Sequence, residues 1–86
     1  MKFLHIGFNN SVSEGRVIAI VGADGTTSRQ LKNEAKKSGK LVDGTSGRRT
    51  RSLIVADSGH IILSSVEPET LLGRSEGKHP GEEGHA

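Results

Sequence analysis

Three arginines fall within four positions of a short glycine-containing segment, "DGTSGRRTRS", residues 43–52. They are Arg48, Arg49 and Arg51. A guanidinium fork can bind two phosphate oxygens or a guanine edge at once, whereas a surface selected only for solubility would accept lysine equally well. The carboxylates near enough in sequence to neutralise them are Asp43 and, beyond the next apolar run, Asp57. The segment therefore predicts a site for a polyanion, and nucleic acid is the natural candidate.

Positive charge is concentrated around this segment. The whole chain carries a formal net charge of +2, yet residues 26–51 hold eight basic and two acidic residues. A predicted helix before the segment places basic side chains on one stripe, and Lys32 and Lys36 are the first we expect to add to the electrostatic field at the site. Two phenylalanines, with no tryptophan or tyrosine, leave few platforms for stacked bases. Duplex DNA, held mainly through its backbone, fits better than a single strand.

Other chemistry is poorly supported by the residues. Gly22 and Gly25 follow an apolar run, as in phosphate-binding loops, but neither the Walker pattern nor the dinucleotide fingerprint is complete. Asp57, Ser58 and His60 stand too close together in a turn to converge as a hydrolase triad. The chain has no cysteine, and its four histidines lack metal-ligand spacing. We therefore expect no enzyme activity, no metal, no cofactor and no small-molecule substrate.

The elements that must position the arginines read as a small α+β domain. Apolar runs predict strands at 2–8, 15–21, 41–42, 51–56 and 60–66, joined into a mainly antiparallel sheet. A basic helix is predicted over 29–38, with a cap from Thr or Ser of the preceding segment and Gly39 as its left-handed C-terminal cap. Gly59 supplies the positive φ of a hairpin turn, and Pro68 opens a short helix that ends at Gly73. The strand at 15–21 is β-branched enough to be buried on both faces.

The size of the chain predicts self-association. Its 86 residues allow one domain, assigned to residues 1–73, and the polar segment 74–86 is predicted to be a disordered tail. Only 31% of the residues are hydrophobic, so one subunit has a thin core, and without disulfides or metal the remaining source of stability is oligomerisation. No apolar run is long enough to span a bilayer, and we expect a cytoplasmic, nucleoid-associated protein.

Two segments carry a family resemblance. "HIGFNNSVSEGRVIAIV" and "LVDGTSGRRTRSLIVADSGHIILSSVEPETL", with the helix between them, resemble the RemA family of small bacterial DNA-binding regulators, first associated with control of extracellular-matrix genes. The likeness extends from about Phe3 to Leu72. The combination of the GRRTR core, the aspartate-containing hairpin and the PET segment is specific, although each alone would not be.

The resemblance implies a DNA-binding protein that lacks a helix-turn-helix and forms a ring, octameric in the family, with DNA passing over it. Its DNA-binding arginines correspond to Arg48, Arg49 and Arg16, while a role for Arg51 is inferred from its charge. We therefore predict a ring-forming transcriptional regulator of the kind that controls biofilm-matrix genes. Two alternatives remain open at this point: an RNA-binding module, and a structural assembly protein that binds an acidic protein partner.

Overall fold

The computed structural model describes residues 2–75. Six strands, two α-helices and one 3-10 turn follow one another in the order β-β-η-β-α-β-β-β-α. Their bounds are β1 Phe3–Gly7, β2 Asn10–Ser13, η1 Glu14–Arg16, β3 Val17–Gly22, α1 Thr26–Ser38, β4 Leu41–Asp43, β5 Ser52–Ala56, β6 Ile61–Ser64 and α2 Pro68–Ser75. The predicted α+β class is confirmed. Strand β2 was missed, because its asparagine and serines resemble a turn.

The strands form two sheets. β3, β5, β6 and β4 lie in that order in a four-stranded sheet, while β1 and β2 form a separate antiparallel hairpin. Within the larger sheet β5 is antiparallel to both neighbours, but β4 is parallel to β6. The sheet is therefore mixed: it is mainly antiparallel, as predicted, but β4 pairs in parallel with β6. The reason is that α1 carries the chain back along the sheet before β4 begins, so β4 runs in the same direction as β3.

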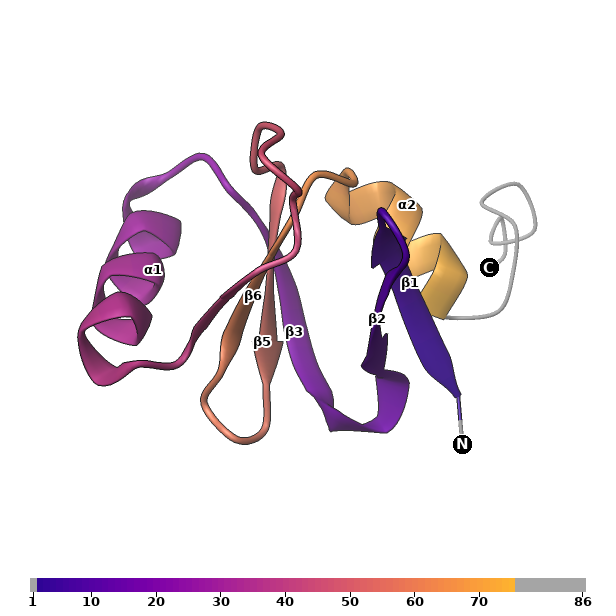
Figure 1. The fold of residues 1–86 in the computed structure, drawn as a ribbon, viewed down its shortest axis with the longest axis horizontal. Coiled ribbons are helices and arrows are strands. Elements are labelled where there is room, and N and C mark those ends of the chain that lie inside the picture. Colours follow the sequence, from indigo (N-terminus) through magenta and orange to yellow (C-terminus); the bar gives the residue numbers. More distant parts are fainter. Residues whose placement is uncertain (1, 76–86) are drawn as a thin grey trace.

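The larger sheet is the middle layer of three. Helix α1 lies over one face, and the β1–β2 hairpin with α2 lies over the other (Figure 1). Side chains that alternate along β5 and β6 build two small cores, because neighbouring strand residues point to opposite faces. Leu4, Ile6, Ile54, Ile62 and Leu71 form the core on the α2 side, and Ala35, Leu53, Ile61 and Leu63 form the one beneath α1.

Strand β3 is an edge strand, and the prediction that it is buried on both faces is wrong. The strands buried on both faces are β5 and β6, which lie at the centre of the sheet. The pairing of β3 with β5 is irregular between Val17 and Ala19, and the intervening Ile18 is 67% exposed. A β-branched run therefore identified a strand but not its place in the sheet.

The helix ends follow the expected chemistry in part. Gly39 has φ 75° and caps α1, and Lys40 N–H donates to the carbonyl of Ala35 over 2.8 Å. The N-cap prediction is wrong, because Gly25 holds that position without a side-chain cap. Gly59 has the predicted positive φ, at 91°. Helix α2 begins at Pro68 as predicted but continues past Gly73, and residues 76–86 of the predicted tail lie outside the described residues.

Candidate nucleic-acid interface

The arginine loop, defined here as residues 44–51, connects β4 to β5 at one end of the sheet (Figure 1). Its first half is a tight turn in which Arg48 N–H donates to the carbonyl of Thr45 over 3.0 Å. The two residues between them, Ser46 and Gly47, both have positive φ, at 52° and 83°. Two successive left-handed residues are typical of a type I′ turn, which fixes the direction in which the chain leaves it. Gly47 therefore sets the geometry of the turn.

Asp43 holds the start of the loop. Its Oδ1 accepts hydrogen bonds from the backbone N–H of Thr45 at 2.9 Å and from the Thr45 hydroxyl at 2.6 Å. The hydroxyl contributes most to lowering the pKa of Asp43 below its ordinary value, and the backbone N–H contributes next. The charge of Lys32 lowers that pKa further, while partial burial acts in the opposite direction. Asp43 therefore shapes the loop and does not neutralise the arginines.

Gly44 anchors the loop to the body of the domain. Its N–H donates to the carbonyl of Leu63 over 2.9 Å, and its own carbonyl accepts from Asn10 Nδ2 over 3.2 Å. A Cβ placed on Gly44 would stand 2.9 Å from that Leu63 oxygen. Gly44 is therefore buried against β6 and the β1–β2 hairpin, and its backbone is not open to a ligand.

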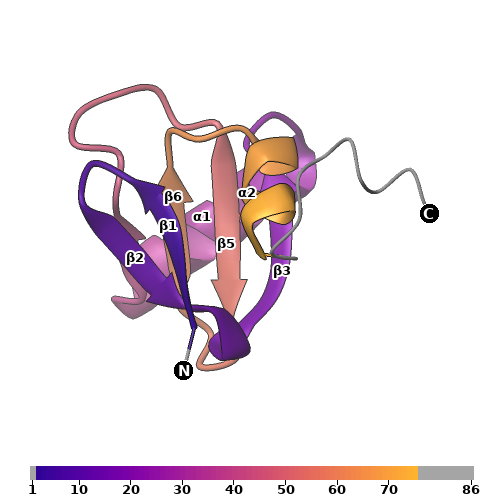
Figure 2. The ribbon, with the colours of Figure 1, turned by 90° about the vertical axis from the view of Figure 1, so that its right-hand side faces the viewer.

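Arg48 lies against an aromatic side chain. Its guanidinium carbon sits over the ring of Phe8, 4.7 Å from the ring centroid, which is a cation–π arrangement. Phe8 belongs to the turn between β1 and β2, which approaches the arginine loop at the same end of the domain (Figure 2). This contact was not predicted from the sequence. The available signal was that Phe8 is one of only two aromatic residues and stands where the first apolar run breaks.

Arg51 is held by a carboxylate that the sequence did not suggest. Its Nη1 lies 3.0 Å from Oε2 of Glu67, which immediately precedes α2. Both side chains are about half exposed, at 47% and 53%. Neither Asp43 nor Asp57, the carboxylates nearest in sequence, pairs with an arginine of the loop.

Unlike Arg51, Arg48 and Arg49 form no ion pair with a carboxylate of residues 2–75. Across residues 2–75, the ion pairs are those of Arg51 with Glu67 and of Arg16 with Asp57. Arg48 and Arg49 are both exposed and enter neither pair. Two guanidinium groups of the predicted three are therefore available to an incoming anion without first leaving a carboxylate.

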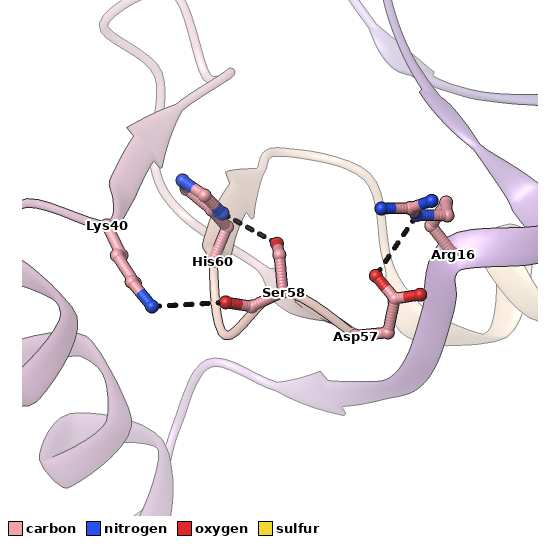
Figure 3. A network of polar contacts seen from close by, with 5 residues as sticks. All are labelled: Arg16, Lys40, Asp57, Ser58 and His60. Atoms are coloured by element: carbon pink, nitrogen blue, oxygen red, sulfur yellow. Dashed lines mark hydrogen bonds and ion pairs between the residues drawn. The ribbon is translucent and has the colours of Figure 1, made fainter.

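Arg16 lies at the opposite end of the sheet. Its Nε donates to Asp57 Oδ1 over 3.1 Å, and Asp57 belongs to the turn between β5 and β6 (Figure 3). Arg16 directly precedes β3, and the loop lies at the end of the sheet where β3 finishes. The six residues of β3, at roughly 3.3 Å each, therefore separate Arg16 from that end of the sheet by about 16–20 Å. One subunit therefore does not bring Arg16 together with Arg48 and Arg49.

Lys32 and Lys36, the two lysines of α1 predicted to act at the site, are exposed and lie at different distances from the loop. Lys32 is close enough to lower the pKa of Asp43. Lys36 lies one helical turn further along α1, which runs away from the loop end of the sheet (Figure 1). Lys32 is therefore the better placed of the two to add to the field at the loop.

The competing sites do not assemble. Near Gly22, the Ser28 hydroxyl turns back to donate to the Gly22 carbonyl. Ser58 Oγ and His60 Nδ1 lie 2.6 Å apart, a contact that the sequence reasoning had excluded, but Asp57 points to Arg16 and completes no triad (Figure 3). Within the described range 2–75, no three potential ligand side chains gather to hold a metal ion, and no helix is long and apolar enough to cross a membrane.

Comparison with known proteins identifies the family. The model of the RemA-like family, "Extracellular matrix regulatory protein A-like", matches residues 3–74. A "Putative regulatory protein" of Geobacillus kaustophilus is 53% identical over 74 residues, which cover 86% of this chain and 85% of that protein. One from Thermotoga petrophila is 52% identical over 71 residues, covering 83% of this chain and 77% of the relative. The chain therefore belongs to the RemA-like family, and its relatives carry the name of regulatory proteins.

Proposed function

We propose that this protein is a transcriptional regulator that binds duplex DNA through the arginine loop and assembles into a ring. The observation that carries the proposal is that Arg48 and Arg49 are exposed, enter no ion pair within residues 2–75, and stand on a turn fixed by Asp43, Thr45 and Gly47. A fixed turn supports affinity, because less conformational freedom is lost when phosphate binds. In keeping with the family, the regulated genes would include those for extracellular matrix.

We expect the protein to bind DNA mainly through the phosphate backbone of the duplex. Arg48 and Arg49 contact phosphates first, while Arg51 must share its guanidinium with Glu67. Lys32 and Lys36 add positive field along α1, and this contribution falls with salt. Arg16 contributes at the other end of the sheet, so within one subunit it contacts a different stretch of DNA from the loop.

Assembly follows from the apolar surface that one subunit leaves uncovered. Ile18 on β3 and Val42 on β4 are both exposed, and these strands form the two opposite edges of the sheet. A contact between unlike surfaces of successive subunits generates a closed ring when the rotation between them closes. Repetition of one loop around such a ring multiplies weak phosphate contacts into strong binding, provided that the duplex can meet several loops at once. We place this assembly in the cytoplasm, on the nucleoid.

The test combines a double variant with a control matched in charge. Arg48→Ala/Arg49→Ala removes two positive charges from the loop, and Lys2→Ala/Lys37→Ala removes two exposed charges outside the proposed site. We expect the first variant to lose duplex binding in a mobility-shift assay and the second to retain most of it, both at the native mass of the wild-type ring. Equal losses would show that only net charge matters, and no loss in the arginine variant would remove the loop from the site.

Competition distinguishes the nucleic acids. Unlabelled duplex DNA should displace a labelled duplex at lower concentration than single-stranded RNA of equal length does. Stronger displacement by the RNA would favour the RNA-binding alternative. A salt-sensitive complex with an acidic protein, and none with DNA, would favour the assembly alternative.

A further inference from the structure

We infer that Phe8 is a positioning residue of the DNA site: its ring holds the Arg48 guanidinium in place and leaves the N–H groups of that arginine free for phosphate. The inference rests on the proposed function, because it assigns a role toward the same ligand. The contact that carries it is the 4.7 Å separation between the Arg48 guanidinium carbon and the centroid of the Phe8 ring.

The backbone at Phe8 is unusual for its side chain. Phe8 and Asn9 form the two-residue turn between β1 and β2, with φ values of 52° and 64°. Such a turn favours asparagine, aspartate or glycine at both positions, and a bulky aromatic residue at positive φ is strained. Phe8 is also 44% exposed, so burial does not explain its presence. A strained and half-exposed aromatic residue is better explained by what its ring contacts.

The turn is also fastened to the loop that it faces. Asn10, which directly follows Asn9, donates from Nδ2 to the carbonyl of Gly44 over 3.2 Å. Gly44 directly precedes the tight turn of the arginine loop, and Arg48 is the last residue of that turn. The hydrogen bond from Asn10 therefore joins the turn that carries the Phe8 ring to the loop that carries the Arg48 guanidinium. The relative position of the ring and the guanidinium does not depend on the cation–π contact alone.

The chemistry suits a phosphate ligand. A cation over an aromatic face is attracted by the ring quadrupole, while the donors of a guanidinium lie in its own plane. The aromatic face therefore restrains Arg48 without occupying its hydrogen-bond donors, whereas a carboxylate would occupy them, as Glu67 does for Arg51. Restraining a long side chain before binding reduces the entropy lost when phosphate is bound.

The test uses a substitution that suits the turn but lacks the ring. Phe8→Asn places a residue that tolerates positive φ at this position, so we expect the thermal midpoint to stay at or above that of the wild type. The affinity for a fluorescein-labelled duplex, measured by anisotropy at low salt, should fall by about two- to fivefold for each engaged loop, the size of an exposed cation–π contact. Phe8→Tyr should restore the affinity, and Asn9→Gly, which alters the same turn, should leave it unchanged.

A double-mutant cycle with Arg48→Ala connects the effect to Arg48. In the Arg48→Ala background, Phe8→Asn should cause no further loss of affinity, because the group that it positions is absent. Wild-type affinity in Phe8→Asn, failure of Phe8→Tyr to rescue, or an equal loss in both backgrounds would overturn the inference while leaving the loop as the DNA site. If Arg48→Ala itself binds as the wild type does, the role proposed for Arg48 fails, and the role of Phe8 fails with it.

Discussion

Neutralising Glu67 is expected to strengthen DNA binding. The Glu67 carboxylate lies 3.0 Å from Arg51 and occupies a guanidinium that would otherwise stand beside Arg48 and Arg49 at the site. Glu67→Gln keeps the shape of the side chain but removes its charge. Glu69→Gln is the matched control, because Glu69 is exposed in the first turn of α2 and forms no ion pair within residues 2–75.

The size of the effect follows from the number of free arginines. With two free guanidinium groups in each engaged loop, the loop should contribute about −1.8 to the slope of log K against log[salt], since each neutralised phosphate contributes about −0.9. Release of Arg51 raises the number to three and this contribution to about −2.7. The part of the slope that comes from the loop should therefore steepen about 1.5-fold however many subunits engage. The exposed ion pair contributes at most about 1 kcal/mol to folding, so the loss of stability should be small.

The assay is anisotropy of a labelled duplex over a series of salt concentrations, with native mass measured for each variant. We expect Glu67→Gln to bind more tightly at low salt and with the steeper slope, whereas Glu69→Gln keeps the wild-type slope. If Glu67→Gln shows the wild-type slope, then Arg51 either contacts DNA already or does not reach it. In both cases the reasoning from the ion pair would be refuted.

Three further predictions concern the loop, the assembly and the core. Thr45→Val removes the hydroxyl donor to Asp43, so the pKa of Asp43 should rise toward its ordinary value of 3.8, as followed by NMR titration. A lowered pKa of Asp43 stabilises the fold at pH values above 3.8, and this stabilisation is lost as the pH falls through the lowered pKa. The wild type should therefore lose more stability than Thr45→Val on acidification, and equal losses would contradict this account. Ile18→Lys places a charge on the exposed edge strand β3 and should lower the native mass, while an unchanged mass would exclude this edge from the subunit contact. Leu53→Ala, at a position only 1% exposed, should cost about 2–5 kcal/mol in denaturant unfolding, and a loss below about 1 kcal/mol would show that the core beneath α1 contributes little.

The sequence was informative wherever a local pattern determines local structure. Apolar runs located β1, β3, β4, β5 and β6, and single glycines at 39 and 59 marked a helix end and a hairpin turn. Local patterns do not determine which strands lie side by side. The parallel pairing of β4 with β6 and the edge position of β3 depend on the path of the whole chain, so the first was not predicted and the second was predicted wrongly.

The same distinction applies to the candidate site. The cluster of arginines was visible in the sequence, because its members are neighbours in the chain. The residues that distinguish those arginines from one another are distant in sequence: Phe8 lies 40 positions before Arg48, and Glu67 lies 16 positions after Arg51. Only the fold shows that one guanidinium lies on an aromatic ring and another on a carboxylate.

Protection of individual arginines from phenylglyoxal measures the central proposal at the residues concerned. The intact protein would be labelled with and without saturating duplex DNA, and each site would be quantified by peptide mass spectrometry. We expect DNA to protect Arg48 and Arg49 strongly and to leave Arg74, which is exposed in the last turn of α2, labelled to the same extent. Labelling of Arg48 and Arg49 that does not change when the protein is fully bound to DNA would contradict the account.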